Sequence, residues 1–259
     1  MANLEVLEKK GELEQLFEGV EKTFIIGSVR EASKNEEEIG EVLKERLKQI
    51  GVRAHLPKKD TVQEARGLHV CMQNGEAIRE SDKVTLLYNE NSKGTHFDLG
   101  ESFKLRKEII PLLFQYNYGD FVGMIKTWEK WGPGEREDIN EEKKNGIFLI
   151  CGPGDEEEAR RFIEEKEKEG IRVFSPFGAE KLGLSKYEYC LLRRAELEAS
   201  GEAHVIFNFD NQALFDLGMA FGDEIPLKVV KNVEYDDEIK SFPQLIDDLE
   251  KVYNIKTKI

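Results

Sequence analysis

The chain of 259 residues lacks several features that would assign it to common classes of protein. Its three cysteines, Cys71, Cys151 and Cys190, form no CxxC pair and are odd in number, so we expect reduced buried thiols and no disulfides. No apolar run approaches the roughly 20 residues of a membrane span. The acidic N-terminus has no signal-peptide pattern. These absences predict a cytoplasmic protein that does not associate with a membrane.

Basic residues are also fewer than acidic residues. The chain has 38 Lys and Arg residues against 52 Asp and Glu residues, which gives a formal net charge of -14. Nucleic-acid polymers and anionic membranes both require clustered basic residues, so we expect a small-molecule partner instead. The hydrophobic and charged fractions are those of a soluble globular protein. The abundance of Glu and Lys indicates a heat-tolerant, thermophile source.

Several motifs of common sites are missing. Neither GxGxxG nor GxxxxGK[ST] occurs, so dinucleotide-binding and nucleoside-triphosphatase sites lack their residues. His69 and Cys71 lie close together, but no second ligand pair has the spacing of a metal site. No glycine-framed serine with an obvious histidine partner suggests a hydrolase triad. We therefore expect no cofactor and no metal.

What the chain does contain is an internal repeat. Each copy has the order strand, helix, strand, helix, strand, helix, strand, and its third helix follows an FDLG segment. In the first copy the strands are expected at 23–28, 52–57, 83–89 and 108–114, and the first two helices at 35–51 and 72–82. In the second copy the strands are expected at 146–154, 171–176, 203–208 and 225–230, and these helices at 155–170 and 187–202.

Continuous apolar strands that alternate with helices are typical of a parallel sheet covered on both faces. We predict an α/β protein of two tandem flavodoxin-like domains, each a doubly wound parallel sheet. The expected boundaries are an N-terminal helix at 1–20, a first domain at 21–126, a charged linker with Gly-Pro-Gly at 127–145, and a second domain at 146–259 that ends in a helix.

Ligands of such sheets bind at the carboxyl ends of the strands, which selects the first-copy loops 27–30, 69–74 and 89–98. Gly27 allows close approach of the backbone, and Ser28 and Arg30 suit an oxyanion such as phosphate. A strand-end turn with a surface arginine is the equally weighted alternative. The second copy has no arginine there and places four acids at 155–158, so it is a poor anion site.

The repeated FDLG segments each contain an acid, Asp98 or Asp216. Thr95 and Asp98 fit a capping box, whereas alanine at 213 leaves Asp216 with only the helix dipole as a structural reason. The phenylalanines and glycines of these segments are expected to pack the helix closely against its sheet.

Residues 23–114 resemble the nucleoside 2-deoxyribosyltransferase superfamily, especially the 2'-deoxynucleoside 5'-phosphate N-hydrolases. The resemblance depends on three segments: Gly27-Ser28-Val29-Arg30, the acid before the third strand in Ser81-Asp82, and the loop Ser92-Lys93-Gly94-Thr95-His96-Phe97-Asp98-Leu99-Gly100. That loop matches the family pattern Ser-x-Gly-x-x-x-Glu-Leu-Gly.

The resemblance implies a role for each matched position. The nucleophile that attacks the anomeric carbon falls on Asp98, and the upstream acid falls on Asn74. The contacts to a 5'-phosphate fall on Ser28, Arg30 and Ser92, and Gly27 and Gly94 complete the substrate-binding loops. Family members work as symmetric dimers or larger assemblies. The resemblance therefore implies a nucleoside or nucleotide ligand and a dimer-like pair within one chain, with further homo-oligomers left open.

Two matched positions depart from the family pattern. Asp98 is one methylene shorter than glutamate, and Asn74 is an amide that cannot serve as a general acid; Glu76 is the nearby acid. These departures leave two main functions open. The first is a nucleoside or nucleotide N-glycosidase or deoxyribosyltransferase, and the second is a non-catalytic nucleotide-binding or sensing module. A scaffold that needs neither Arg30 nor Ser92 is a third.

Overall fold

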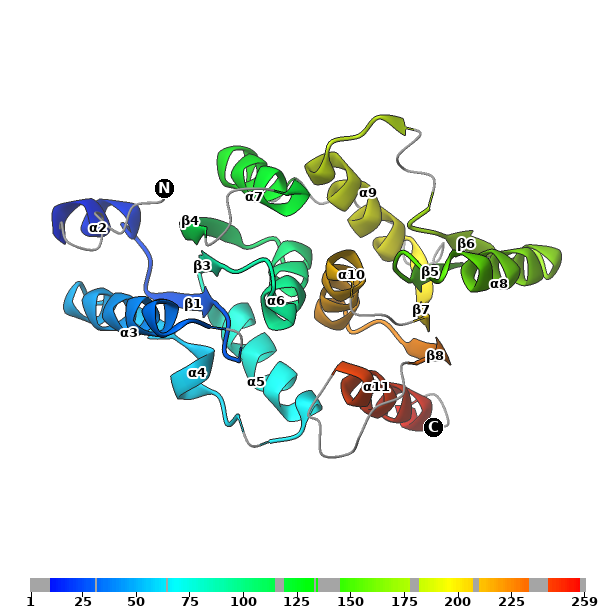
Figure 1. Ribbon diagram of the computed structural model, residues 1–259, viewed down its shortest axis with the longest axis horizontal. Coiled ribbons are helices and arrows are strands. Elements are labelled where there is room, and N and C mark those ends of the chain that lie inside the picture. The colour runs from blue at the N-terminus through cyan, green and yellow to red at the C-terminus, as the bar shows by residue number, and fades with distance from the viewer. Residues whose placement is uncertain are drawn as a thin grey trace.

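The computed structural model describes residues 10–30, 32–63, 65–114, 119–132, 134, 145–177, 182–206, 210–232 and 242–256. It confirms the predicted α/β fold (Figure 1). Two four-stranded sheets, both wholly parallel, have the strand orders β2-β1-β3-β4 and β6-β5-β7-β8. The equivalent orders and the helices on both faces of each sheet define two flavodoxin-like domains.

The first domain contains α2 (Lys10–Leu16), β1 (Lys22–Ile26), α3 (Lys34–Gln49), β2 (Arg53–His55), α4 (Pro57–Asp60), α5 (Gly67–Glu80), β3 (Lys83–Tyr88), α6 (Lys93–Lys104), β4 (Glu108–Phe114) and α7 (Asp120–Trp131). The second contains β5 (Gly146–Ile150), α8 (Glu156–Lys168), β6 (Arg172–Phe174), α9 (Lys186–Glu198), β7 (Ser200–Ile206), α10 (Asn211–Gly222), β8 (Leu227–Lys231) and α11 (Phe242–Lys256). Every predicted strand is present.

The main differences from the predicted elements lie in α5, α6 and α7. Helix α6 starts at Lys93, so residues 93–98 of the predicted loop 89–98 are helical. Helix α5 starts at Gly67, five residues before the predicted start, so the predicted loop 69–74 is helical. Helix α7 was not predicted, and it includes 127–131, the first five residues of the predicted linker. It forms because its apolar residues are spaced to give one buried face, which ends at the fully buried Trp128. Residues 1–9 and 135–144 lie outside the described residues.

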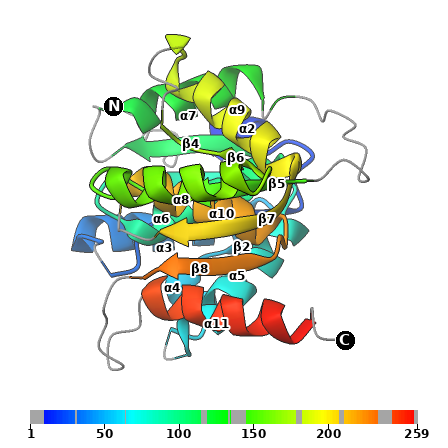
Figure 2. The ribbon, with the colours of Figure 1, turned by 90° about the vertical axis from the view of Figure 1, so that its right-hand side faces the viewer.

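The sheets and helices form layers, seen from two sides in Figures 1 and 2. Helices α2 and α3 pack on the outer face of the first sheet, and α8 packs on the outer face of the second. Between the sheets, α5, α6 and α7 share one continuous apolar core with α9, α10 and α11. The three cysteines are buried and unpaired, as predicted. Among the described residues, no helix is both long and apolar enough to cross a membrane.

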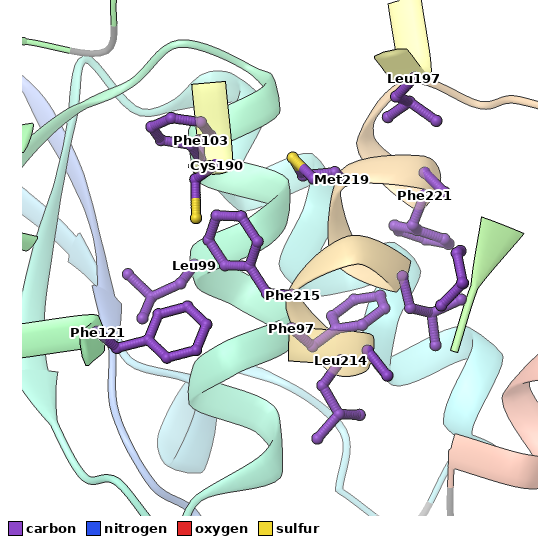
Figure 3. Close-up of a cluster of buried hydrophobic side chains, with 14 of the residues drawn as sticks. Phe97, Leu99, Phe103, Phe121, Cys190, Leu197, Leu214, Phe215, Met219 and Phe221 are labelled. Atoms are coloured by element: carbon purple, nitrogen blue, oxygen red, sulfur yellow. The ribbon is translucent and has the colours of Figure 1, made fainter. Parts of the chain in front are cut away.

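Helices α6 and α10, which carry the repeated FDLG segments, lie side by side at the centre of the molecule (Figure 3). A Cβ atom on Gly100 would lie 2.0 Å from the carbonyl oxygen of Phe215, and one on Gly218 would lie 2.0 Å from that of Phe97. These two contacts are equivalent in the repeat. The expected packing role of the glycines is therefore right, but the close partner is the helix of the other domain and not the sheet.

Candidate functional site

The candidate site lies where β1 and β3 end. Gly27 and Ser28 follow β1 and are partly buried, and Arg30 is exposed two residues further along. A small hollow next to this turn is lined by Gly27, Ser28, Glu36, Glu37, Gly40, Glu41, Leu56, Lys58 and Leu87. It therefore joins the end of β1 to α3 and to the segment after β2.

Carboxylates dominate the hollow. Glu36 is buried and accepts hydrogen bonds from the backbone N–H of Ser33 at 2.8 Å and from Nδ2 of Asn89 at 3.0 Å, so it bridges the start of α3 and the loop after β3. Among the described residues of the lining, Lys58 is the one cation, and it forms an ion pair with Glu37. Hydroxyl and amine donors suit such a lining better than a phosphate does, because its acceptors are mostly anionic.

The start of α6 differs from the predicted capping box of Thr95 and Asp98. Ser92 is the N-cap, and its side chain accepts a hydrogen bond from the backbone N–H of Thr95 at 3.3 Å. The ring of His96 donates from Nδ1 to the Ser92 carbonyl at 2.9 Å. Gly94 lies in the first turn, with open space where a Cβ would be. The capping prediction was therefore wrong, and Asp98 owes its position to something other than the cap.

Asp98 and Asn74 are brought together as predicted, although Asn74 lies in a helix. Asp98 occupies the second turn of α6, and its side chain is buried with 4% of its surface exposed. Burial raises the pKa of Asp98 to about 7, and a hydrogen bond from the Asn74 side chain partly opposes this rise. Among the described residues, no lysine or arginine forms an ion pair with Asp98. Its carboxyl therefore changes charge near neutral pH.

Glu101, one turn after Asp98, was not predicted as a site residue. It is fully buried, and neither carboxyl oxygen has a hydrogen-bond partner among the described residues. Its nearest cationic group is Arg79, with Nη2 3.8 Å from Oε1. Burial raises the pKa of Glu101 to about 8, with a further contribution from Asp98. The i, i+3 spacing from Asp98 on a buried helix was the available signal.

The second domain neutralises its acid. Arg193 of α9 is fully buried and donates from Nε and Nη2 to Oδ2 of Asp216 at 3.1 and 2.9 Å. Its Nη2 also donates to the Leu149 carbonyl at 2.7 Å, and the guanidinium lies 3.9 Å from the Phe148 ring centre. Burial raises the pKa of Asp216, and Arg193 opposes this rise. The prediction that only the helix dipole supports Asp216 was therefore wrong.

Arg193 is the counterpart of Asn74, since each lies on the helix that precedes its domain's third strand and contacts the acid of its FDLG segment. The two copies thus treat the same buried acid differently. The second domain pairs Asp216 with an arginine that also donates to the backbone of β5. The first domain places Asp98 beside an amide. The RR dipeptide at 193–194 was the signal in the sequence for this difference.

Within the described part of the chain, no three His, Cys, Asp or Glu side chains form a group that could hold a metal ion. Comparison with models of known protein families, with curated proteins and with solved structures found no match. The resemblance of residues 23–114 to the deoxyribosyltransferase superfamily therefore stays a prediction from the sequence. The geometry around Asp98 is the basis for a functional hypothesis.

Proposed function

We propose that the first domain is a nucleoside or nucleotide N-glycosidase, or a related deoxyribosyltransferase, that cleaves the bond between base and deoxyribose. The observation that supports this proposal is the contrast between the two buried acids. Asp216 has a full ion pair with Arg193, as expected of an acid retained for structure. Among the described residues Asp98 has the Asn74 amide and no ion pair, and it titrates near neutral pH, as expected of an acid retained for chemistry.

In this mechanism the Asp98 carboxylate attacks the anomeric carbon of the sugar. A C–O bond forms, the C–N bond to the base breaks, and the base leaves with the bonding electrons and takes up a proton. Water then cleaves the sugar ester in an N-glycosidase, or a second base attacks it in a transferase. Asn74 holds the carboxyl by its amide and is not the acid that protonates the base.

The second candidate is a non-catalytic module that binds a nucleotide or a related small molecule. It is favoured by the amide at Asn74, where the resembling family has an acid, and by the small exposed fraction of Asp98. Glu76, the acid nearest to Asn74 in the sequence, is exposed on α5 and therefore does not take the place of the family's buried acid.

One experiment separates the two candidates. The protein is incubated with 2'-deoxynucleosides and with their 5'-monophosphates, while free base and thermal stability are both measured. Base release that is lost in Asp98→Asn supports the enzyme. Ligand-dependent stabilisation without release, reduced in Arg30→Ala, supports the binding module. If the protein neither releases base nor is stabilised by any of these ligands, both candidate functions are contradicted. Asp216→Asn is not a suitable control, because it breaks a buried ion pair, so Glu45→Gln on the exposed side of α3 serves instead.

A further inference from the structure

A chain of buried polar groups leads away from Asp98 and involves two residues that the proposed mechanism does not use. Nε2 of His55, at the end of β2, lies 2.9 Å from Oγ1 of Thr61. The Thr61 hydroxyl donates to Oδ1 of Asn74 at 2.7 Å. The Asn74 side chain in turn lies close enough to Asp98 to lower the pKa of its carboxyl. His55 belongs to β2, Thr61 follows α4, Asn74 lies in α5 and Asp98 lies in α6. The tertiary fold alone therefore brings the four residues together.

The hydrogen bonds of this polar chain have a donor-to-acceptor direction, which follows from counting protons. A threonine hydroxyl has one proton, and here it is donated to the Asn74 oxygen. The His55 ring nitrogen must therefore carry a proton and donate to Thr61. With its oxygen occupied, Asn74 directs its NH2 group to Asp98, which agrees with the lowering of the Asp98 pKa by this amide.

The outer end of the chain is held firmly. The His55 ring stacks on Phe24, with centroids 5.4 Å apart and planes 16° from parallel. The Asp60 carboxylate accepts a hydrogen bond from the backbone N–H of Leu56 at 2.7 Å and pairs with Lys44, which fixes the turn between His55 and Thr61. Burial lowers the pKa of His55, while Asp60 raises it and Lys44 lowers it. The ring is therefore neutral at physiological pH.

The described residues of the second domain do not form this chain. By strand register, Phe174 takes the place of His55, since Phe24 pairs with His55 and Phe148 pairs with Phe174. Arg193 replaces Asn74 and bonds the Phe174 carbonyl at 3.3 Å. In the part of the molecule that the structure describes, the polar chain therefore occurs beside the acid that has no arginine partner.

We propose that Thr61 and His55 are positioning residues, which fix the orientation of the Asn74 amide so that its NH2 group faces the Asp98 carboxylate. This inference rests on the proposed function only for its catalytic consequence. An asparagine amide turned by 180° would present its oxygen to the carboxylate, and the two oxygens would repel each other. The Thr61 hydroxyl disfavours that arrangement, because it donates its proton to the Asn74 oxygen, and a turned amide would replace this bond with one in which Thr61 accepts from the NH2 group.

The test follows the titration of Asp98 itself. The 13C resonance of its carboxyl carbon is assigned with Asp98→Asn and measured against pH in the wild type, Thr61→Val, Thr61→Ser and His55→Phe. Valine keeps the shape of threonine without the hydroxyl, serine restores the hydroxyl, and phenylalanine keeps the stacking on Phe24. Cys71 and Arg79 of α5 and Glu101 of α6 also surround this pair, and all four proteins retain them.

We expect Thr61→Val to raise the midpoint of the Asp98 titration by about one pH unit, which is the equivalent of one lost hydrogen bond. His55→Phe should shift it less in the same direction, and Thr61→Ser should match the wild type. An unchanged midpoint in Thr61→Val, with Thr61→Ser and Thr61→Val both folded, overturns the proposal. A raised midpoint in a protein that releases no base from deoxynucleosides supports the positioning role and contradicts the proposed function alone.

Discussion

At the scale of single residues, the molecule buries three carboxyls on its two central helices and compensates them unequally. The Asp216 carboxylate is paired with Arg193, and the Asp98 carboxyl lies beside the Asn74 amide. The Glu101 carboxyl has no hydrogen bond among the described residues. A buried carboxyl with no hydrogen bond and its cation 3.8 Å away favours the protonated form, because the charged form costs far more to bury than the neutral form. Neutral Glu101 beneath Asp98 is therefore the state that folding favours.

Glu101 should make the protein less stable as pH rises. Its folded pKa of about 8 lies above that of a free glutamate, so its protonated form favours the folded state, and this contribution disappears as pH rises from about 4.5 to about 8. Glu101→Gln cannot ionise. It should match the wild type near pH 5 and exceed it by on the order of a few kcal/mol near pH 8.5 in urea unfolding. The exposed Glu45→Gln is the control, and parallel pH curves for Glu101→Gln and wild type would contradict the prediction.

The two FDLG acids should respond oppositely to the same substitution. Asp216→Asn removes the fully buried carboxylate that pairs with Arg193 and leaves this arginine only the partly buried Glu196 among the described residues, which costs on the order of 3 kcal/mol. Asp98→Asn removes a carboxyl whose ionisation is penalised by burial, so it should retain or raise stability at pH 8. Denaturant unfolding of both variants measures the difference. Equal losses would show that Asp98 also has a structural ion pair.

At the scale of elements, the contact between α6 and α10 depends on glycine. Replacing Gly100 or Gly218 with alanine would drive a methyl group into the backbone of the opposite helix at 2.0 Å, a contact that no rotamer can relieve. Each substitution should cost at least about 2 kcal/mol. Gly123→Ala on α7 meets nothing within 4 Å and should stabilise by about 0.5–1 kcal/mol. Thermal unfolding of the three variants tests this, and equal effects would refute it.

Local sequence patterns predicted the elements far better than they predicted the site. Apolar runs that alternate with helices identified every strand, because the central parallel strands are buried on both faces and leave a continuous signal. Strand ends and the family resemblance selected Ser28, Asn74 and Asp98, and their role as a site stays a prediction. Arg193, Thr61 and His55 were missed because they reach Asp216, Asn74 and Thr61 respectively only through tertiary packing, which sequence spacing does not encode. Helix α7 was missed because Gly-Pro-Gly and the charges after it suggested a linker.

At the scale of the whole molecule, duplication has produced two sheets that share one core and two sites that differ. The acids of both FDLG segments face inward near the shared helices, where α6 and α10 hold the domains together. One domain has filled the space beside its acid with an arginine, and the other has retained an amide linked to a threonine and a histidine. On this account the second domain supports the first and does not bind substrate itself.

The pH dependence of base release from 2'-deoxynucleosides tests the central claim most directly. If ionised Asp98 is the nucleophile, kcat/KM should rise with pH to a half-maximal value near pH 7, where this carboxyl titrates, and should vanish in Asp98→Asn. A wild-type rate that persists in Asp98→Asn, or that is already maximal at pH 5, would contradict the assignment of Asp98 as the reacting group.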